Sequence, residues 1–146
     1  SVGKIIQKAL AGTNKKLTLE LGGKSANIIF DDAPLDQAVE GVVNGIFFNQ
    51  GHVCCAGSRL YVQESVAEKV IAKLKERMKT LYVGDPLDKN TDIGAINSKQ
   101  QLEVIQKYLK IGQQEGAEMF QSSCAVPKKG FYCRPTIFTN VERLFV

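Results

Sequence analysis

The sequence predicts an α/β fold with a mostly parallel sheet and alternating helices. Short apolar runs rich in β-branched and aromatic residues alternate with longer runs in which apolar residues recur every three or four positions. Glycine, proline and aspartate separate these runs. Strands that alternate with helices usually join one parallel sheet, and the chain has no internal repeat or low-complexity linker. We therefore expect residues 1–146 to form one structural unit.

The first half of the chain is expected to contain two helices and two strands. Apolar residues at helical spacing predict helices over 2–10 and 34–48. Alternating leucines predict a strand over 16–21, and a short apolar run predicts another over 26–30. Paired glycines or aspartates follow each predicted strand and end it.

The second half continues the alternation of strands and helices. The expected elements are a strand over 60–63, helices over 66–81 and 99–111, a strand over 117–122 and an extended segment over 131–138. These five elements complete the predicted α/β order.

Local signals refine the predicted helices. Serine followed three residues later by Glu or Gln is typical of a capping box, and the pattern occurs at Ser65 and at Ser98. Gly41 and Gly45 are four residues apart in the second helix, and this spacing indicates close approach of another backbone.

The overall charge and hydropathy exclude several classes of protein. The formal net charge is only +4, and the sequence has no basic run with interleaved aromatic residues, so nucleic-acid binding is not expected. No apolar stretch is long enough to cross a bilayer and no signal peptide is visible, so we expect no membrane association. The chain starts with Ser1 in a helical pattern rather than with methionine, which indicates a fragment of a larger protein.

The four cysteines are Cys54, Cys55, Cys124 and Cys133. The sequence contains no C-x-x-C spacing and only one histidine, so neither a disulfide framework nor a metal site is expected. Reduced thiols and a cytoplasmic location follow from this pattern.

The segment 49–59 presents two of these cysteines on a glycine-containing turn between a predicted helix and a predicted strand. A thiol on such a turn lies near backbone N–H donors, which can stabilise the reactive thiolate. The alternative is that Cys54 and Cys55 are small buried hydrophobic residues that fill a gap in the core.

Two segments together resemble the active-site motifs of the aldehyde dehydrogenase superfamily. The family's E-L-G-G-K-S motif matches 20–25, and its F-x-x-x-G-Q-x-C motif matches 47–54. The 34-residue separation between Glu20 and Cys54 also matches the family. Further similar segments occur at 2–4, 30–33, 56–59, 83–86 and 135–138. Within the superfamily, the chain looks most like the long branch that carries a second aldehyde-dehydrogenase-like domain.

The resemblance implies oxidation of an aldehyde to a carboxylic acid through a cysteine thioester. Cys54 would be the nucleophile, and Glu20 would be the base that activates the hydrolytic water. Val53, Cys55 and His52 would line the substrate pocket. His52 departs from the family pattern, because it replaces Gln or Glu. A charged imidazole there would stabilise the nearby thiolate, and the alternative is that His52 only replaces an amide's hydrogen bonds.

The same resemblance implies NAD or NADP as the cofactor. Val2 and Gly3 would begin the helix that faces the pyrophosphate, and Leu21 and Gly22 would lie near the nicotinamide. Residues 1–20 would end the cofactor-binding region, and 21–146 would be part of the catalytic domain. We expect the fragment alone to be inactive, and the family's oligomers imply a dimer or tetramer.

Two other functions remain open from the sequence. A long family member can keep the fold as a non-catalytic scaffold or interaction domain without performing the reaction. Alternatively, Cys54 and Cys55 could act as a thiol-based redox sensor, although adjacent cysteines form only a strained disulfide.

Overall fold

The computed structural model describes residues 2–141 and confirms the α/β fold. Its elements, in order, are α1 (Val2–Leu10), β1 (Ala26–Ile29), α2 (Leu35–Phe47), the 3-10 turn η1 (Phe48–Gly51), β2 (Arg59–Val62), α3 (Glu64–Lys79), α4 (Lys99–Gln114), β3 (Glu118–Gln121) and β4 (Thr136–Thr139). Ser1 and residues 142–146 belong to the expected single unit but lie outside the described residues.

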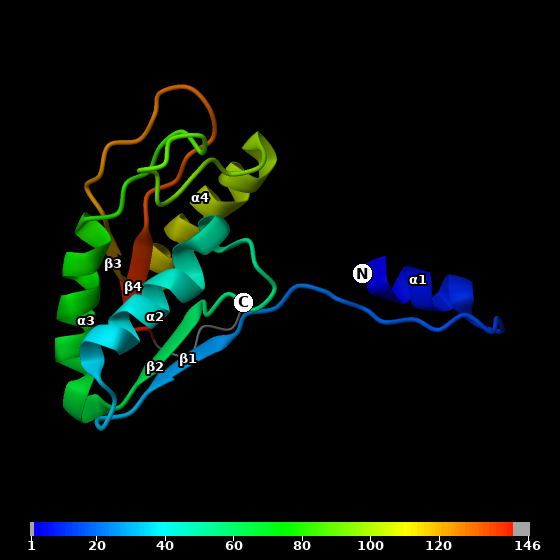
Figure 1. The fold of residues 1–146 in the computed structure, drawn as a ribbon, viewed down its shortest axis with the longest axis horizontal. Helices are drawn as coiled ribbons and strands as arrows, with labels where there is room; N and C mark the ends of the chain where they lie inside the picture. The colour runs from blue at the N-terminus through cyan, green and yellow to red at the C-terminus, as the bar shows by residue number, and fades with distance from the viewer. Residues whose placement is uncertain (1, 142–146) are drawn as a thin grey trace.

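The first strand pair is parallel and joined by α2. β1 pairs with β2 in a register that runs from Ala26 opposite Arg59 to Ile29 opposite Val62. α2 connects the end of β1 to the start of β2 and lies beside the two strands in Figure 1. This β1–α2–β2 unit is the connection that parallel strands require.

The second strand pair is antiparallel. β3 pairs with β4 in a register that runs from Glu118 opposite Thr139 to Gln121 opposite Thr136. α4 packs on this pair. Gly112 of α4 lies so close to Phe138 of β4 that a Cβ built on the glycine would be 2.8 Å from the ring. A parallel bridge between Val83 and Ile93 orders the connection from α3 to α4. The described strands thus combine parallel and antiparallel pairing.

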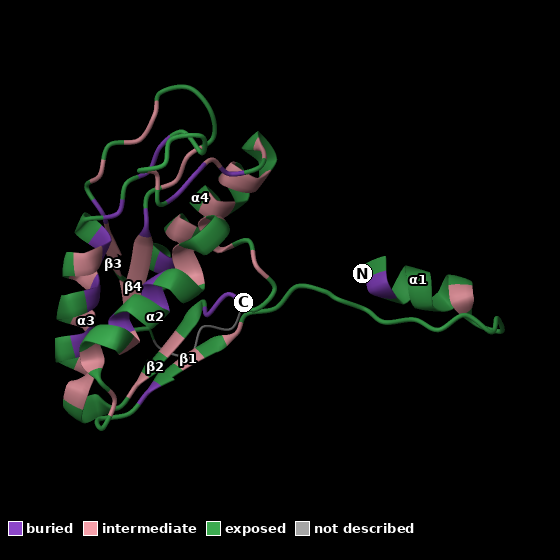
Figure 2. Cartoon of the chain, viewed as in Figure 1, coloured by how far each residue is buried: buried purple, intermediate pink, exposed green. Residues whose placement is uncertain are grey.

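The hydrophobic core lies between α2, α3 and the strands. Figure 2 shows the buried faces of α2 and α3 turned toward each other. The core residues of these two helices are Val39, Val42, Val43, Val70, Leu74 and Met78. Their spacing of three or four residues explains why both helices were predicted from the sequence alone.

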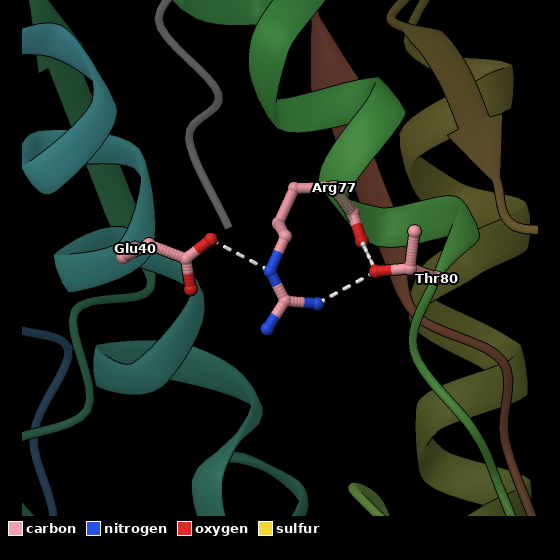
Figure 3. Close-up of polar contacts among 3 residues, drawn as sticks. All are labelled: Glu40, Arg77 and Thr80. Atoms are coloured by element: carbon pink, nitrogen blue, oxygen red, sulfur yellow. Dashed lines mark hydrogen bonds and ion pairs between the residues drawn. The ribbon is translucent and has the colours of Figure 1, made fainter.

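Charged residues connect the outer edges of the same two helices. Figure 3 shows Arg77 of α3, whose Nε donates to Glu40 Oε1 of α2 at 2.7 Å. Arg77 Nη1 also donates to Thr80 Oγ1 at 2.8 Å, and this hydroxyl donates to the Arg77 carbonyl at 2.9 Å. Because Glu40 and Arg77 are partly exposed, the pair contributes at most about 1 kcal/mol, and the apolar interface contributes more.

The predicted strand over 16–21 is wrong. Residues 16–21 are extended but pair with no strand among the described residues, and Leu17, Leu19 and Leu21 are 38%, 37% and 53% exposed. An alternating pattern forms a strand only where a partner supplies the ladder of hydrogen bonds. Figure 1 shows α1 and this extended segment projecting away from the rest of the chain.

The two predicted capping boxes have different outcomes. The Ser98 hydroxyl accepts from Gln101 N at 3.1 Å, so this serine caps α4 as predicted. The prediction for Ser65 is wrong, because α3 begins earlier, at Glu64, and Ser65 lies within its first turn. The Ser65 hydroxyl instead joins the side chains of Gln63 and Asp31, which connects the start of α3 to the end of β1.

Candidate active site

The parallel register places the two motif segments side by side. Segment 20–25 leads into β1 and segment 47–58 leads into β2, so both meet at the amino ends of these strands. Residue pairs in the ladder differ by 59 − 26 = 33 positions. Glu20 and Cys54 differ by 54 − 20 = 34 positions, and each lies five or six residues before the strand that its segment enters. The pairing of the two strands thus brings the ends of both motif segments to the same edge.

Backbone contacts hold the two segments together beyond the strands. Arg59 N donates to Ser25 O at 3.2 Å, and Arg59 Nε donates to Lys24 O at 2.8 Å. A Cβ placed on Gly23 would lie only 3.3 Å from the carbonyl oxygen of Cys54. Gly23 therefore gives the backbone of Cys54 room to approach, because a glycine has no Cβ.

Asn27 fixes the path of the chain just after the cysteines. Its Nδ2 donates to Gly57 O at 3.0 Å, and Gly57 N donates to Gly45 O at 3.0 Å. The close approach predicted for Gly45 is therefore present. The same prediction for Gly41 is wrong, because a Cβ at Gly41 would meet nothing within 4 Å.

Replacing Gly57 with alanine is expected to destabilise this arrangement by about 1–3 kcal/mol, because the substitution overfills a closely packed region. The new Cβ would lie 2.1 Å from Asn27 Nδ2. Denaturant unfolding of the native protein measures the effect. Gly41→Ala is the matched control, and it should be neutral or stabilising because it places alanine in open space within a helix. Equal effects of the two substitutions would contradict this assignment.

The turn before Cys54 has an unusual backbone. Asn49, Gln50 and Gly51 all have positive φ, of 48°, 56° and 77°. Hydrogen bonds within the turn support it, since His52 N donates to Asn49 O at 3.0 Å and Asn49 Nδ2 donates to His52 O at 3.1 Å. Three consecutive left-handed residues reverse the chain sharply between α2 and the cysteines.

Gln50 connects this turn to the segment between α3 and α4. In the amide orientation that satisfies both ends of its side chain, Gln50 Oε1 accepts from Gly94 N at 3.0 Å. Its Nε2 then donates to Asn49 O at 3.0 Å. The Cys54 turn is therefore supported from a segment about 40 residues further along the chain.

The structure places both cysteines of the turn at the surface. Cys54 and Cys55 are free and exposed, so the alternative that they fill a gap in the core is wrong. His52 is exposed and Val53 is half-buried beside them. Ala56 N donates to Val53 O at 3.0 Å and closes the tight turn that presents Cys54.

Glu20 lies in the exposed extended segment that leads toward Gly23. Among the described residues, no hydrogen bond joins its carboxylate to the Cys54 thiol. The contact between Gly23 and the Cys54 carbonyl brings their two segments together, so both side chains belong to one end of the β1–β2 pair.

Two of the four predicted cofactor residues are neighbours. A Cβ on Gly3 would lie 2.9 Å from Leu21 Cδ1, so the start of α1 contacts the segment that follows Glu20. Val2 is 67% exposed, and a Cβ on Gly22 would meet nothing within 4 Å. The backbone at these positions is therefore accessible to a bound molecule.

A large groove between β2 and β4 lies away from the candidate site. It has a volume of about 1120 Å³ and is lined by side chains of α2 and α3. Neither Cys54 nor Glu20 lines it, so the groove is not part of the candidate site.

Within residues 2–141, no cluster of three or more potential metal ligands is present. Nor is any helix in that range long and apolar enough to cross a membrane.

The sequence did not identify Asn27, Gln50 and Gly94 as parts of the site. Asn27 could have been found, because it is a polar residue inside an otherwise apolar strand run, where a specific hydrogen bond is expected. The contact between Gln50 and Gly94 has no local sequence signal.

Comparisons with known proteins agree with this geometry. The family model described as "Aldehyde dehydrogenase family" matches residues 1–145. An aldehyde dehydrogenase of Davidiella tassiana is 49% identical over 141 residues, which are 96% of this chain and 28% of that protein. Retinal dehydrogenase 2 of Gallus gallus is 48% identical over 141 residues, which are 96% of this chain and 27% of that protein.

Solved structures give the same result. An aldehyde dehydrogenase from Bacillus cereus, determined in complex with NAD+, superposes with a TM-score of 0.88 at 39% identity, over 97% of this chain and 29% of that one. The chain thus spans less than a third of the length of these relatives. The resemblance to the long branch with a second domain stays a prediction. The family model, the relatives and the shared fold together establish that the chain belongs to the aldehyde dehydrogenase family.

Proposed function

We propose that the protein containing this chain oxidises an aldehyde to a carboxylic acid with NAD+ or NADP+, through a thioester on Cys54. One observation supports this most directly. The exposed thiol of Cys54 lies on a turn whose backbone contacts the Glu20–Ser25 segment at Gly23. A nucleophile and a carboxylate on adjoining segments are the two groups that this reaction requires.

Cys54 performs the first step. Its thiolate attacks the aldehyde carbon and forms a carbon–sulfur bond, and the Cys54 backbone N–H stabilises the oxygen that becomes negatively charged. A bound NAD+ or NADP+ would supply the acceptor for the hydride that leaves this carbon, which would leave a thioester on Cys54. Glu20 then removes a proton from the water that attacks the thioester. The carboxylic acid is released and the Cys54 thiolate is regenerated.

Val53, Cys55 and His52 shape the substrate pocket in this proposal. They flank Cys54 on the same turn, and the half-buried Val53 offers apolar surface beside two exposed polar residues. The imidazole of His52 is exposed two residues from the nucleophile, where it can contact a bound substrate.

The residues proposed to bind the cofactor fit a dinucleotide. The amino end of α1 offers free backbone N–H groups for a phosphate, and the contact of Gly3 with Leu21 places that end beside the catalytic segment. Open space at Gly22 allows the nicotinamide to approach the backbone. Val2, Gly3, Leu21 and Gly22 would therefore position the cofactor, whose binding in a relative is documented by the Bacillus cereus complex.

The proposal extends to the organisation of the whole protein. Residues 1–20 would end the cofactor-binding region and 21–146 would belong to the catalytic domain, a division supported by the separate position of α1 in Figure 1. A cytoplasmic location is proposed from the pattern of free cysteines, and a homo-oligomer, either dimer or tetramer, is proposed from the family resemblance.

The test is formation of NADH or NADPH by the native protein that contains this chain. The aldehyde panel should include small aliphatic aldehydes and retinal, since one relative is named a retinal dehydrogenase. Aldehyde-dependent NADH or NADPH together with the matching carboxylic acid would support the proposal. A folded protein that binds NAD+ but forms no product from any aldehyde would instead indicate the scaffold function.

A further inference from the structure

The register of the β3–β4 pair continues beyond its last ladder residues. Gln121 lies opposite Thr136 at the end of the ladder. Ser122 N then donates to Pro135 O at 3.0 Å, so the two segments stay paired for one more position. In an antiparallel pair, each further position raises the residue number by one in the first segment and lowers it by one in the second. Continuing the same register by two positions would place Cys124 opposite Cys133, since 122 + 135 and 124 + 133 are both 257, while the Cys124 N–H itself donates to Ser122 Oγ at 3.4 Å.

The pairing geometry suits a covalent link between these cysteines. Because hydrogen-bonded pairs alternate along an antiparallel ladder, a ladder that includes the Ser122–Pro135 bond would make Cys124 and Cys133 a pair of the same kind. Such pairs have Cα atoms about 5.5 Å apart, which is within the range of disulfide bonds. Arg134 adds a further connection, since its Nε donates to Cys124 O at 2.8 Å.

Cys124 also affects the Cys133 thiol electrostatically. Burial raises the pKa of the Cys133 thiol, the Arg134 guanidinium lowers it, and the neighbouring Cys124 raises it. Both cysteines are free and half-buried, and Cys124 packs against the hydrophobic core. The pair is therefore partly shielded, unlike the exposed Cys54 and Cys55.

We propose that Cys124 and Cys133 form a redox site that closes to a disulfide on reaction with a small-molecule disulfide such as oxidised glutathione. One thiolate attacks a sulfur of the oxidant, breaks its S–S bond and releases one glutathione thiolate. The second cysteine then attacks the mixed disulfide and releases the second glutathione. The protein loses two electrons and two protons, and one glutathione disulfide becomes two glutathione thiols.

The disulfide would close a ring of 133 − 124 + 1 = 10 residues at the end of the β3–β4 pair. The loop within this ring is already attached to the rest of the structure, because Ile96 N donates to Phe131 O at 2.6 Å. Ile96 lies two residues beyond Gly94, the residue that supports Gln50 in the turn before Cys54. Oxidation would thus fix a loop that is linked by hydrogen bonds to the segment supporting this turn.

The experiment uses the native protein, treated with glutathione disulfide, alkylated and digested with trypsin. Because trypsin cleaves between the cysteines at Lys128 and Lys129, the disulfide would join peptide 111–128 to peptide 130–143. We expect a linked species that is two hydrogen atoms lighter than the sum of the two peptides and that dithiothreitol separates. The proposal is wrong if both peptides carry only alkylated cysteine, only glutathione, or a link to another cysteine.

Two variants test the geometry. Cys133→Ser should remove the linked species. The double variant Cys124→Ser with Ser123→Cys keeps a thiol but moves it by one residue, which turns it to the opposite face of the chain. This variant should lose at least about nine-tenths of the linked species, while its circular dichroism stays that of the native protein. Undiminished linkage in the shifted variant would contradict a pair that depends on this register. Neither result depends on the proposed catalytic reaction.

Discussion

Replacing Cys54 with serine is expected to lower kcat/KM for aldehyde oxidation by the native protein by at least about 10³-fold. Serine keeps the size of the side chain, but its hydroxyl is un-ionised near neutral pH and is a much weaker nucleophile than a thiolate. The exposed position of Cys54 means that the substitution removes no core packing. Initial rates of NADH formation over a range of aldehyde concentrations measure the effect.

Cys55→Ser is the matched control for this prediction. Cys55 has the same exposure and lies on the same turn, but it is one residue beyond the position that the cysteine motif assigns to the nucleophile. Its replacement should change kcat/KM by less than about tenfold, as expected for a residue that contacts the substrate without forming the covalent bond. A reversed pattern, in which Cys55→Ser is inactive and Cys54→Ser is active, would move the nucleophile to Cys55.

Glu20→Gln is expected to lower the steady-state rate by about 10²- to 10⁴-fold while leaving the first turnover visible. In the proposed reaction, Glu20 acts mainly on the hydrolytic water, so the thioester forms and then accumulates. Rapid mixing should therefore show a burst of about one NADH per active site, followed by slow turnover. Hydroxylamine, a small nucleophile that attacks thioesters directly, should restore part of the turnover.

The control carboxylate is Asp32, which is exposed and lies at the other end of β1. Asp32→Asn removes a similar charge from the surface without changing the candidate site, and it should keep the native rate. A native steady-state rate in Glu20→Gln would exclude Glu20 as the base. Loss of the burst together with the steady-state rate would show instead that Glu20 acts before thioester formation, by removing the proton of the thiol.

The sequence predicted those elements whose side chains repeat along one chain segment. α2 and α3 have apolar residues every three or four positions, and the structure buries those faces. The strands β1 and β2 follow from short apolar runs bounded by turn residues. The candidate site was predicted from two motifs, and the register of β1 and β2 explains why these motifs meet.

Features that depend on a distant partner were not predictable in this way. Segment 16–21 alternates like a strand, but no described strand pairs with it. The positive φ of Gln50 is accompanied by a contact with Gly94, which is remote in the sequence. The proposed pairing of Cys124 with Cys133 could be inferred only once the register of β3 and β4 was known. Local patterns contain no information about such partners.

The fixed register between β1 and β2 also determines where the protein can tolerate insertions and deletions of residues. An insertion or deletion of one codon between these strands would change the separation of Glu20 and Cys54 in sequence, whereas hydrogen bonds hold both ends of the crossover in place. Within α2, it would also rotate the following residues by about 100° around the helix axis. We therefore expect length variation to be rejected in 30–53, between β1 and Cys54, and accepted in loop 125–130, which lies far from both motifs in the sequence.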